Sequence, residues 1–153
     1  MQDKVYKFVQ KQVNEKGIKG RVLDVGSLDV NGSLRPLFPD YFGVDMRAGK
    51  NVDIVANSHL LPFKNKSFDL VVCVETLEHD DQPFKTMSEI YRVLKDGGWC
   101  IITAPYITFP KHCYPSDYWR FTAEAFKVLL KKFKNVEAFE DENETYGIGQ
   151  KLK

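Results

Sequence analysis

The sequence has little that would direct the protein to a membrane, to nucleic acid or out of the cell. Its 153 residues carry 22 basic and 21 acidic side chains, a formal net charge of +1, so no excess positive charge is available for a phosphate backbone. No run of about 18 uncharged apolar residues occurs. The first stretch, MQDKVYKFVQKQVNEKG, is charged throughout and is unlike a signal peptide. We therefore expect a cytoplasmic protein without a nucleic-acid or membrane partner.

Cysteine is also scarce. There are three cysteines, and no two of them form a CxxC pair. Cys73 and Cys100 lie inside apolar runs, which predicts buried free thiols. Cys113 follows His112, a pair that could bind a metal or supply a thiolate nucleophile, but the sequence contains neither a second ligand pair nor a zinc-site spacing. On this basis no metal ion is expected.

Repeats and low-complexity tracts are absent too, and short apolar runs alternate instead with segments of helical periodicity. The apolar runs are nearly unbroken, as in strands that are covered on both faces. The predicted strands span residues 21–25, 41–45, 52–56, 68–75 and 99–103, and the tail from residue 135 is predicted to form a terminal hairpin.

Four helices are predicted around these strands. Their expected caps and ends are Gly17 and Gly20 for the first, Asn31 or Ser33 for the second, Asp80 or Asp81 and residues 96–98 for the third, and Thr122 for the fourth. The second helix is short and has Pro36 in its first turn. Strands that alternate with helices give crossover connections and a mostly parallel sheet between helical layers, which predicts a three-layer α/β fold.

Ligands of such sheets bind beyond the carboxyl ends of the strands. The turn after the first strand lacks the GxGxxG pattern, since Gly26 is followed by SLDVNG. Gly26 still lets the chain turn sharply, and Asp45, 19 residues later, stands where a nucleotide-binding fold places the acid that binds a ribose diol. Asn57, after the third strand, offers an amide for an adenine edge. Each of the three would also serve as an ordinary turn residue, but together they describe an adenosine site.

Five stretches carry a resemblance that covers most of the chain: VLDVGS, GVD, ANSHLLPF, FDLVVCVETLEH and EIYRVLKDGGWCIITAP, in that order. Residues 22–104 resemble the class I S-adenosylmethionine-dependent methyltransferases, the large group that includes small-molecule and quinone-biosynthesis methyltransferases. The resemblance implies a Rossmann-like sandwich whose mostly parallel, seven-stranded sheet ends in a C-terminal antiparallel hairpin. It also implies S-adenosyl-L-methionine as cofactor and one methyltransferase domain over residues 1–153, with an N-terminal helix (1–20), a cofactor-binding half (21–104) and a substrate-side half (105–153).

The same resemblance assigns expected roles to single residues. Asp24 would lie near the methionine amino group, Gly26 and Ser27 along the methionine moiety, and Asp45 at the ribose. The expected cofactor contacts are Asp24, Gly26, Ser27, Gly32, Asp45, Met46, Asn57, Ser58 and Glu75. The chain departs from the family pattern at the glycine loop, because the second family glycine is Leu28 and the next glycine follows late, at Gly32.

Methyl transfer from a sulfonium requires mainly a positioned acceptor, and a general base only where the acceptor carries a proton. The candidate bases are His79, after the fourth strand, and His112, in the long loop after the fifth. His79 would equally make a structural hydrogen bond, and His59 is expected to be solvated. The aromatic residues of the 104–121 loop would form an acceptor wall or pack the loop on the core, with Arg120 paired to Asp117; these aromatics are Tyr106, Phe109, Tyr114, Tyr118 and Trp119.

Three other functions stand as alternatives to methyl transfer to an unidentified small molecule. An NAD-dependent oxidoreductase or epimerase would need GxGxxG and usually YxxxK, and neither is present. Methylation of exocyclic base amines needs [DN]PP[YFW] where this chain has ETLE. A non-catalytic cofactor-binding protein that assists a partner enzyme remains an alternative, because the chain is short for this group. Its pocket is therefore expected to be open, or to be completed by a second copy or a partner protein.

Overall fold

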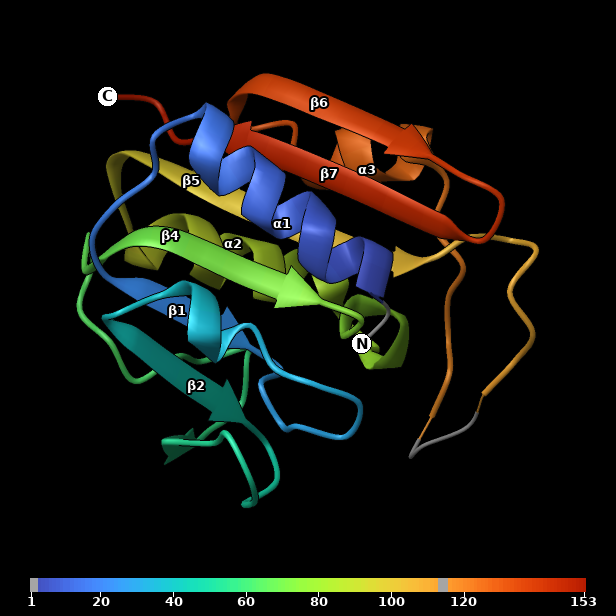
Figure 1. The fold of residues 1–153 in the computed structure, drawn as a ribbon, viewed down its shortest axis with the longest axis horizontal. Coiled ribbons are helices and arrows are strands. Elements are labelled where there is room, and N and C mark those ends of the chain that lie inside the picture. The colour runs from blue at the N-terminus through green and yellow to red at the C-terminus, as the bar shows by residue number, and fades with distance from the viewer. Residues whose placement is uncertain (1–2, 113–115) are drawn as a thin grey trace.

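The computed structural model describes residues 3–112 and 116–153, so Cys113 and Tyr114 lie outside the described part of the chain. Seven strands form one sheet in the order β3-β2-β1-β4-β5-β7-β6 (Figure 1). The strands are β1 (Val22–Val25), β2 (Tyr41–Asp45), β3 (Ile54–Val55), β4 (Phe68–Val74), β5 (Leu94–Pro105), β6 (Lys134–Glu140) and β7 (Glu144–Gln150). The helices are α1 (Asp3–Glu15), α2 (Pro83–Val93) and α3 (Ala123–Leu129), and two single 3₁₀ turns are η1 (Arg35–Leu37) and η2 (Leu77–His79).

Strands β1 to β5 are parallel, and β7 runs antiparallel between β5 and β6. Strand β1 lies between β2 and β4, with Val22 in register with both Tyr41 of β2 and Leu70 of β4. The predicted mostly parallel, seven-stranded sheet with a C-terminal antiparallel hairpin is confirmed. Because the parallel strands share one direction, their carboxyl ends meet at a single edge, from which residues 106–112 extend after β5 (Figure 1).

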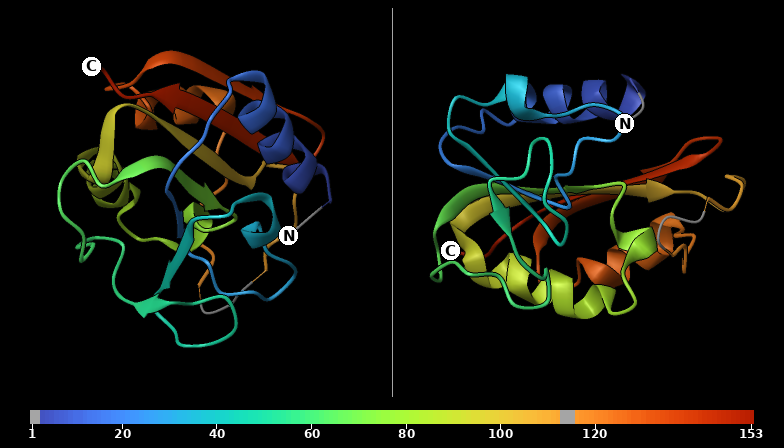
Figure 2. Two further views of the ribbon diagram at one scale, coloured as in Figure 1. Left: turned by 60° about the vertical axis from the view of Figure 1, so that its left-hand side comes forward. Right: turned by 90° about the horizontal axis from the view of Figure 1, so that it is seen from below.

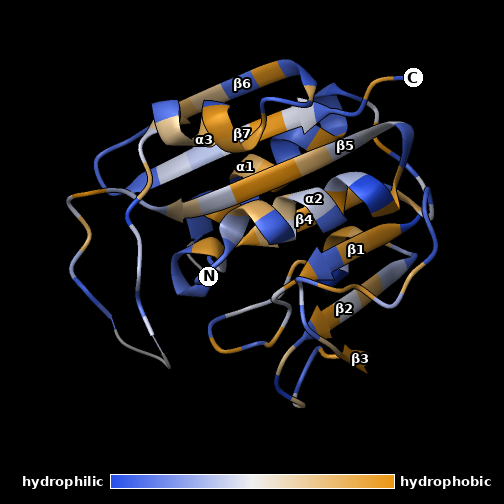
Figure 3. Cartoon of the chain, turned by 180° about the vertical axis from the view of Figure 1, so that it is seen from behind, coloured by the Kyte–Doolittle hydropathy of each residue, from blue (hydrophilic) through white to orange (hydrophobic). Residues whose placement is uncertain are grey.

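Helix α1 covers one face of the sheet, and α2 and α3 cover the other (Figure 2). Under α1, residues such as Val5, Val9 and Ile148 form one buried cluster, while α2 and α3 close a second one around Ile90, Ile102 and others. Hydrophobic residues dominate the central strands (Figure 3), which explains why these strands read as unbroken apolar runs in the sequence. The three-layer prediction is thereby confirmed.

Several predicted boundaries are wrong. The helix after Asn31 and Ser33 is only the single turn η1, and the third strand is Ile54–Val55 rather than 52–56, as befits an edge strand. Helix α2 ends at Val93 instead of 96–98, because Leu94 already pairs with Phe68 of β4. Its N-cap is Gln82, whose backbone N–H donates to Asp80 at 2.9 Å.

Helix α3, the last of the four predicted helices, begins as predicted, since the Thr122 side chain accepts a hydrogen bond from the Ala125 N–H. Cys73 and Cys100 are buried free thiols, also as predicted. Within the described ranges, no helix has the length and apolar character that a membrane crossing requires.

Candidate functional site

The carboxyl ends of β1 and β2 are joined through a buried carboxyl group, that of Asp24. The Tyr41 hydroxyl donates to Asp24 Oδ2, and Asn51 Nδ2 donates to the same hydroxyl at 2.8 Å. The other oxygen, Oδ1, is buried without a hydrogen-bond partner among the described residues. Burial raises the pKa of Asp24 to about 7, against the opposing effect of the Tyr41 hydrogen bond. Asp24 is therefore a buried acid with one oxygen left for a further donor.

Gly26 and Ser27 form the turn that follows β1. Gly26 has a φ of +80°, and a Cβ at this position would come within 2.1 Å of Thr76 Oγ1. The glycine is thus required by the packing of Thr76 from the β4 end. Ser27 is buried, and its hydroxyl donates to the Asn51 carbonyl at 2.9 Å. Both residues lie at the edge formed by the carboxyl ends of the strands, where Thr76 packs against Gly26 and Asn51 bonds to Ser27.

Asp45 ends β2, and its carboxylate faces the turn after β1. Oδ2 accepts the Leu28 N–H at 3.1 Å, and Oδ1 accepts the Arg47 N–H at 3.0 Å. Each carboxylate oxygen can accept two hydrogen bonds, so both retain capacity for one more donor. A carboxylate oriented in this way by two backbone amides is suited to bind a pair of adjacent hydroxyl groups.

The other expected cofactor contacts are less closely grouped. Met46 is 69% exposed next to Asp45, and Gly32 donates its N–H to Asp29 Oδ1 at 2.7 Å. Asn57 is exposed and accepts the His59 N–H at 2.8 Å, while the Ser58 hydroxyl bonds to Thr86. Asn57 thus makes the turn contact that was the alternative to adenine recognition.

A second group of acids lies at the ends of β4, β5 and β7. Glu75 has a φ of +52°, rare for a non-glycine residue, and its Oε1 accepts from Thr103 at 3.3 Å. Glu78 and Glu144 are both fully buried. Burial raises the pKa of Glu78 and of Glu144 well above the ordinary value, and the neighbouring Glu75 adds to both shifts. The edge therefore concentrates carboxyl groups, and Arg120 and Lys4 offset the pKa shifts of Glu78 and Glu144 only in part.

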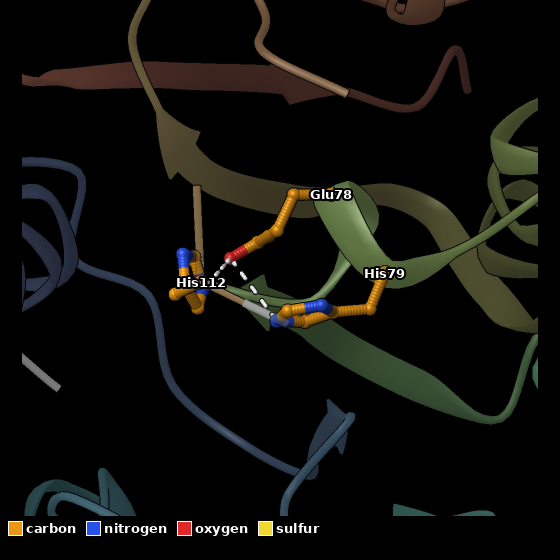
Figure 4. Close-up of side chains that lie close together, drawn as sticks. All are labelled: Glu78, His79 and His112. Atoms are coloured by element: carbon orange, nitrogen blue, oxygen red, sulfur yellow. Dashed lines mark ion pairs between the residues drawn. The ribbon is translucent and has the colours of Figure 1, made fainter. Parts of the chain in front are cut away.

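The two candidate bases, His79 and His112, are brought together although 33 positions separate them in the sequence. Their rings meet edge to face with centroids 5.0 Å apart. Glu78 lies between them, with Oε2 at 3.6 Å from His79 Nε2 and at 3.7 Å from His112 Nε2 (Figure 4). The pair lies beyond the end of β4, on η2 and in the long loop after β5.

Residues 116–120 of the long loop are held against η2 and Asp80 by backbone and side-chain hydrogen bonds. Arg120 pairs with both oxygens of Asp117 at 2.6 and 2.7 Å, and it also donates to the Phe109 and Pro110 carbonyls. The Trp119 indole N–H donates to the Asp80 carbonyl at 2.7 Å. The expected Arg120–Asp117 pair is confirmed. Tyr118 and Trp119 remain 53% and 43% exposed, so they leave aromatic surface beside the site.

The expectation that His59 is solvated is wrong. Its side chain is 18% exposed, and Nε2 lies 2.6 Å from Asp80 Oδ1. Asp80 also accepts hydrogen bonds from Thr86 and from the Gln82 N–H. His59 therefore belongs to a hydrogen-bonded turn that ties the loop after β3 to the start of α2.

The sequence did not single out four residues that matter at this edge: Tyr41, Asn51, Glu78 and Glu144. Tyr41 begins β2 and would have been taken as core, and Asn51 sits in a loop without any motif. Glu78 lies within the LEH stretch, so its position directly before His79 was the one available signal. Glu144 reaches the site only because β7 inserts antiparallel beside β5.

Two surface hollows lie away from these residues. One of about 190 Å³ is lined by residues of α2 and α3, and one of about 230 Å³ lies between α1 and η1. Neither includes a residue of the strand-end site. At the strand-end site, Met46 and Asn57 are exposed.

Comparison with known families gives a match within the first two thirds of the chain. The family described as "Methyltransferase domain" matches residues 23–102, more than half of the chain. The matched segment runs from β1 into β5 and includes Asp24, Asp45 and His79. It ends before the loop that carries His112.

Two curated relatives, one of them named as a methyltransferase, match part of the chain. The chain is 32% identical over 117 residues to an uncharacterised protein of Methanocaldococcus jannaschii, covering 66% of this chain and 46% of the relative. It is 31% identical over 83 residues to the ubiquinone/menaquinone biosynthesis C-methyltransferase of Rhizobium etli, covering 54% of this chain and 32% of that enzyme. The chain thus spans less than half the length of these curated relatives.

A solved structure shares the fold over nearly the whole chain. The 1,6-didemethyltoxoflavin-N1-methyltransferase of Burkholderia thailandensis, with its substrate and S-adenosylhomocysteine bound, superposes with a TM-score of 0.75 at 16% identity. The match covers 97% of this chain and 78% of that structure. At this identity the likeness concerns the fold.

The raised pKa of Asp24 predicts a pH-dependent stability. Because the folded chain holds this proton more tightly than the unfolded chain, the contribution is complete below about pH 4 and is lost as the pH rises through about 7. Asp24→Asn cannot titrate, so its free energy of unfolding should fall less steeply over this interval, by up to about 1.4 kcal/mol per pH unit. Urea unfolding of both proteins at a series of pH values measures the difference. Asp40→Asn, on an exposed carboxyl at the other end of β2, serves as control, and parallel curves for Asp24→Asn and the wild type would refute the assignment.

Proposed function

The chain belongs to the class I S-adenosylmethionine-dependent methyltransferases, and from this we propose that it transfers a methyl group from S-adenosylmethionine to a small-molecule acceptor. The observation that carries the proposal is the pair of acids at the tips of the adjacent strands β1 and β2. Asp24 is buried with a free oxygen, and Asp45 is oriented by two backbone amides. Such a pair fits a ligand that has an ammonium group and a ribose diol.

The residues present fit the cofactor in charge and in hydrogen-bonding capacity. A buried carboxyl with an unpartnered oxygen is unfavourable until a donor reaches it, and the methionine ammonium would supply that donor at Asp24. The diol would use the remaining acceptor capacity of Asp45, and the exposed Met46 side chain would cover the adenine. We extend the proposal to Gly26, Ser27, Gly32, Asn57, Ser58 and Glu75 as further cofactor contacts.

When bound, the cofactor supplies an activated methyl group, so the protein's part is to position the acceptor and to remove its proton. Orientation alone is worth roughly 7–11 kcal/mol, and a general base adds about 10²- to 10⁴-fold. His79 and His112 are the proposed bases, because both rings lie at the end of β4. The exposed rings of Tyr118 and Trp119 are proposed as an acceptor wall.

The proposal assigns residues 21–104 to the cofactor and residues 105–153 to the acceptor within one methyltransferase domain over 1–153. The exposed position of the site supports a role for a second copy or a partner protein in closing it over the acceptor. Two free buried thiols, Cys73 and Cys100, support a reducing compartment such as the cytoplasm.

Replacement of Asp45 tests cofactor binding directly. We expect Asp45→Ala to weaken S-adenosylmethionine binding by about 1.5–3 kcal/mol, the range for hydrogen bonds to a charged group. Isothermal titration calorimetry on the full chain measures the change. Asp40→Ala, which removes a carboxylate from the opposite end of the same strand region, should bind like the wild type. An unchanged affinity of Asp45→Ala removes Asp45 from the site, and tighter binding of NAD than of S-adenosylmethionine would favour an oxidoreductase.

Replacement of His112 tests catalysis separately from binding. A screen for S-adenosylhomocysteine release over sugars, phenols and amines would first identify an acceptor. With that acceptor, His112→Ala should lose about 10²- to 10⁴-fold in turnover while its cofactor affinity stays intact. Normal turnover would leave His112 a structural residue. Release from none of the acceptors, despite cofactor binding, would favour a non-catalytic partner of another enzyme.

A further inference from the structure

We propose that Glu78, His79 and His112 form a binding site for a divalent transition-metal ion, of which Zn²⁺ is the representative, on the acceptor side of the strand-end edge. The three residues each present one ligand atom, and these atoms all lie within 4.8 Å of one another. Two imidazoles and one carboxylate form a donor set that binds zinc and other first-row ions in proteins.

The spacing of the three side chains suits a shared ion better than direct contact. Glu78 Oε2 lies 3.6 Å from His79 Nε2 and 3.7 Å from His112 Nε2, which exceeds hydrogen-bond length. Ligand atoms at 2.0–2.2 Å from a tetrahedral ion are separated by about 3.4 Å. Both contacts converge on the same carboxylate oxygen, with the two rings on either side of it (Figure 4).

The other ring nitrogen of each imidazole, Nδ1, faces an oxygen atom of residues 116–117. The His79 Nδ1 atom contacts the Ser116 carbonyl, and the His112 Nδ1 atom lies 3.6 Å from Asp117 Oδ2. Asp117 is itself fixed by Arg120 and by the His112 N–H at 2.7 Å. The carbonyl acceptor at His79 Nδ1 holds a proton there and leaves His79 Nε2 with its lone pair, which is the arrangement that metal-bound histidines use.

The Glu78 carboxylate requires a cation or a proton. Its side chain is fully buried, and neither oxygen has a hydrogen-bond partner among the described residues. No lysine or arginine of the described ranges forms an ion pair with it; its ion-pair partners are the two histidines. Isolated buried carboxylates are strongly unfavourable, and an ion held by Glu78 and both imidazoles would neutralise this one.

A second group of residues, His59, Asp80 and Asp81, also has ligand atoms close together. There, however, Asp80 is already engaged by His59, Thr86 and the Gln82 N–H. That group therefore has the character of a completed hydrogen-bond network, and His59 offers a matched control.

The role of the ion rests on the proposed methyl transfer. With the ion bound, His79 and His112 act as ligands in place of general bases, because a metal-bound Nε2 has no lone pair left for a proton. Three protein ligands leave a coordination position open, as in catalytic zinc sites, and the His112 side chain is 42% exposed. An acceptor hydroxyl or thiol bound there would have a lowered pKa and would lose its proton to solvent. Its oxygen or sulfur would then form the bond to the methyl carbon as the carbon–sulfonium bond breaks, and the sulfonium sulfur would keep the electron pair.

Metal titration of the full chain tests the site without any methyltransfer assay. The protein is freed of metal with a chelator and titrated with Zn²⁺ by calorimetry and with Co²⁺ by visible absorption. We expect the wild-type chain to bind one equivalent of each ion. In Glu78→Gln and in His112→Ala, which each remove a ligand, the affinity should fall by more than the roughly 10- to 100-fold that is typical when a residue hydrogen-bonded to a ligand is changed. His59→Ala should bind as the wild type does.

Three results would overturn the site: no binding of either ion, undiminished binding by both ligand variants, or loss of binding in His59→Ala. Should Glu78→Gln fail to fold by circular dichroism, the exposed His112→Ala and the conservative His79→Gln decide the outcome. Calorimetry with S-adenosylmethionine on the metal-free chain keeps the two proposals apart. Cofactor binding without Zn²⁺ binding contradicts the ion site alone, and Zn²⁺ binding without cofactor binding contradicts the proposed function alone.

Discussion

Parallel pairing of β1 with both β2 and β4 is the constraint on which the site depends. It places the ends of three strands at one edge, so that Asp24, Asp45 and Glu75 become neighbours although 51 positions separate the first from the last. The antiparallel insertion of β7 next to β5 adds Glu144 to the same edge. Sheet topology alone therefore assembles an acidic site from segments that have no common motif.

The acids of this edge differ in burial and in hydrogen-bond partners. Asp45 is satisfied by backbone amides and keeps acceptor capacity, whereas Asp24 and Glu78 are buried with oxygens that lack a donor among the described residues. Buried carboxyls of this kind stay protonated or await a cation. An ammonium at Asp24 and a metal ion at Glu78 would each relieve one of them, and the two proposals share this physical origin.

Most of the architecture could be predicted from the sequence, because unbroken apolar runs and helical stripes reflect local periodicity. Element ends were less predictable: α2 stops at Val93 because Leu94 pairs across the sheet, which is a tertiary effect. The positions of Asp24 and Asp45 followed from strand order and resemblance. The meeting of His79 with His112 could not be predicted, since it depends on Arg120 and Trp119 fastening a long loop onto η2. For the same reason, ligand spacing in the sequence gave no indication of a metal site.

The central claim is that S-adenosylmethionine lies across the tips of β1 and β2. A crystal structure of the chain grown with S-adenosylhomocysteine tests it most directly. The account predicts that the ribose hydroxyls bind the Asp45 carboxylate and that the amino group approaches Asp24. Density for the nucleoside in the hollow between α2 and α3, or at the edge but without contact to Asp45, would contradict it.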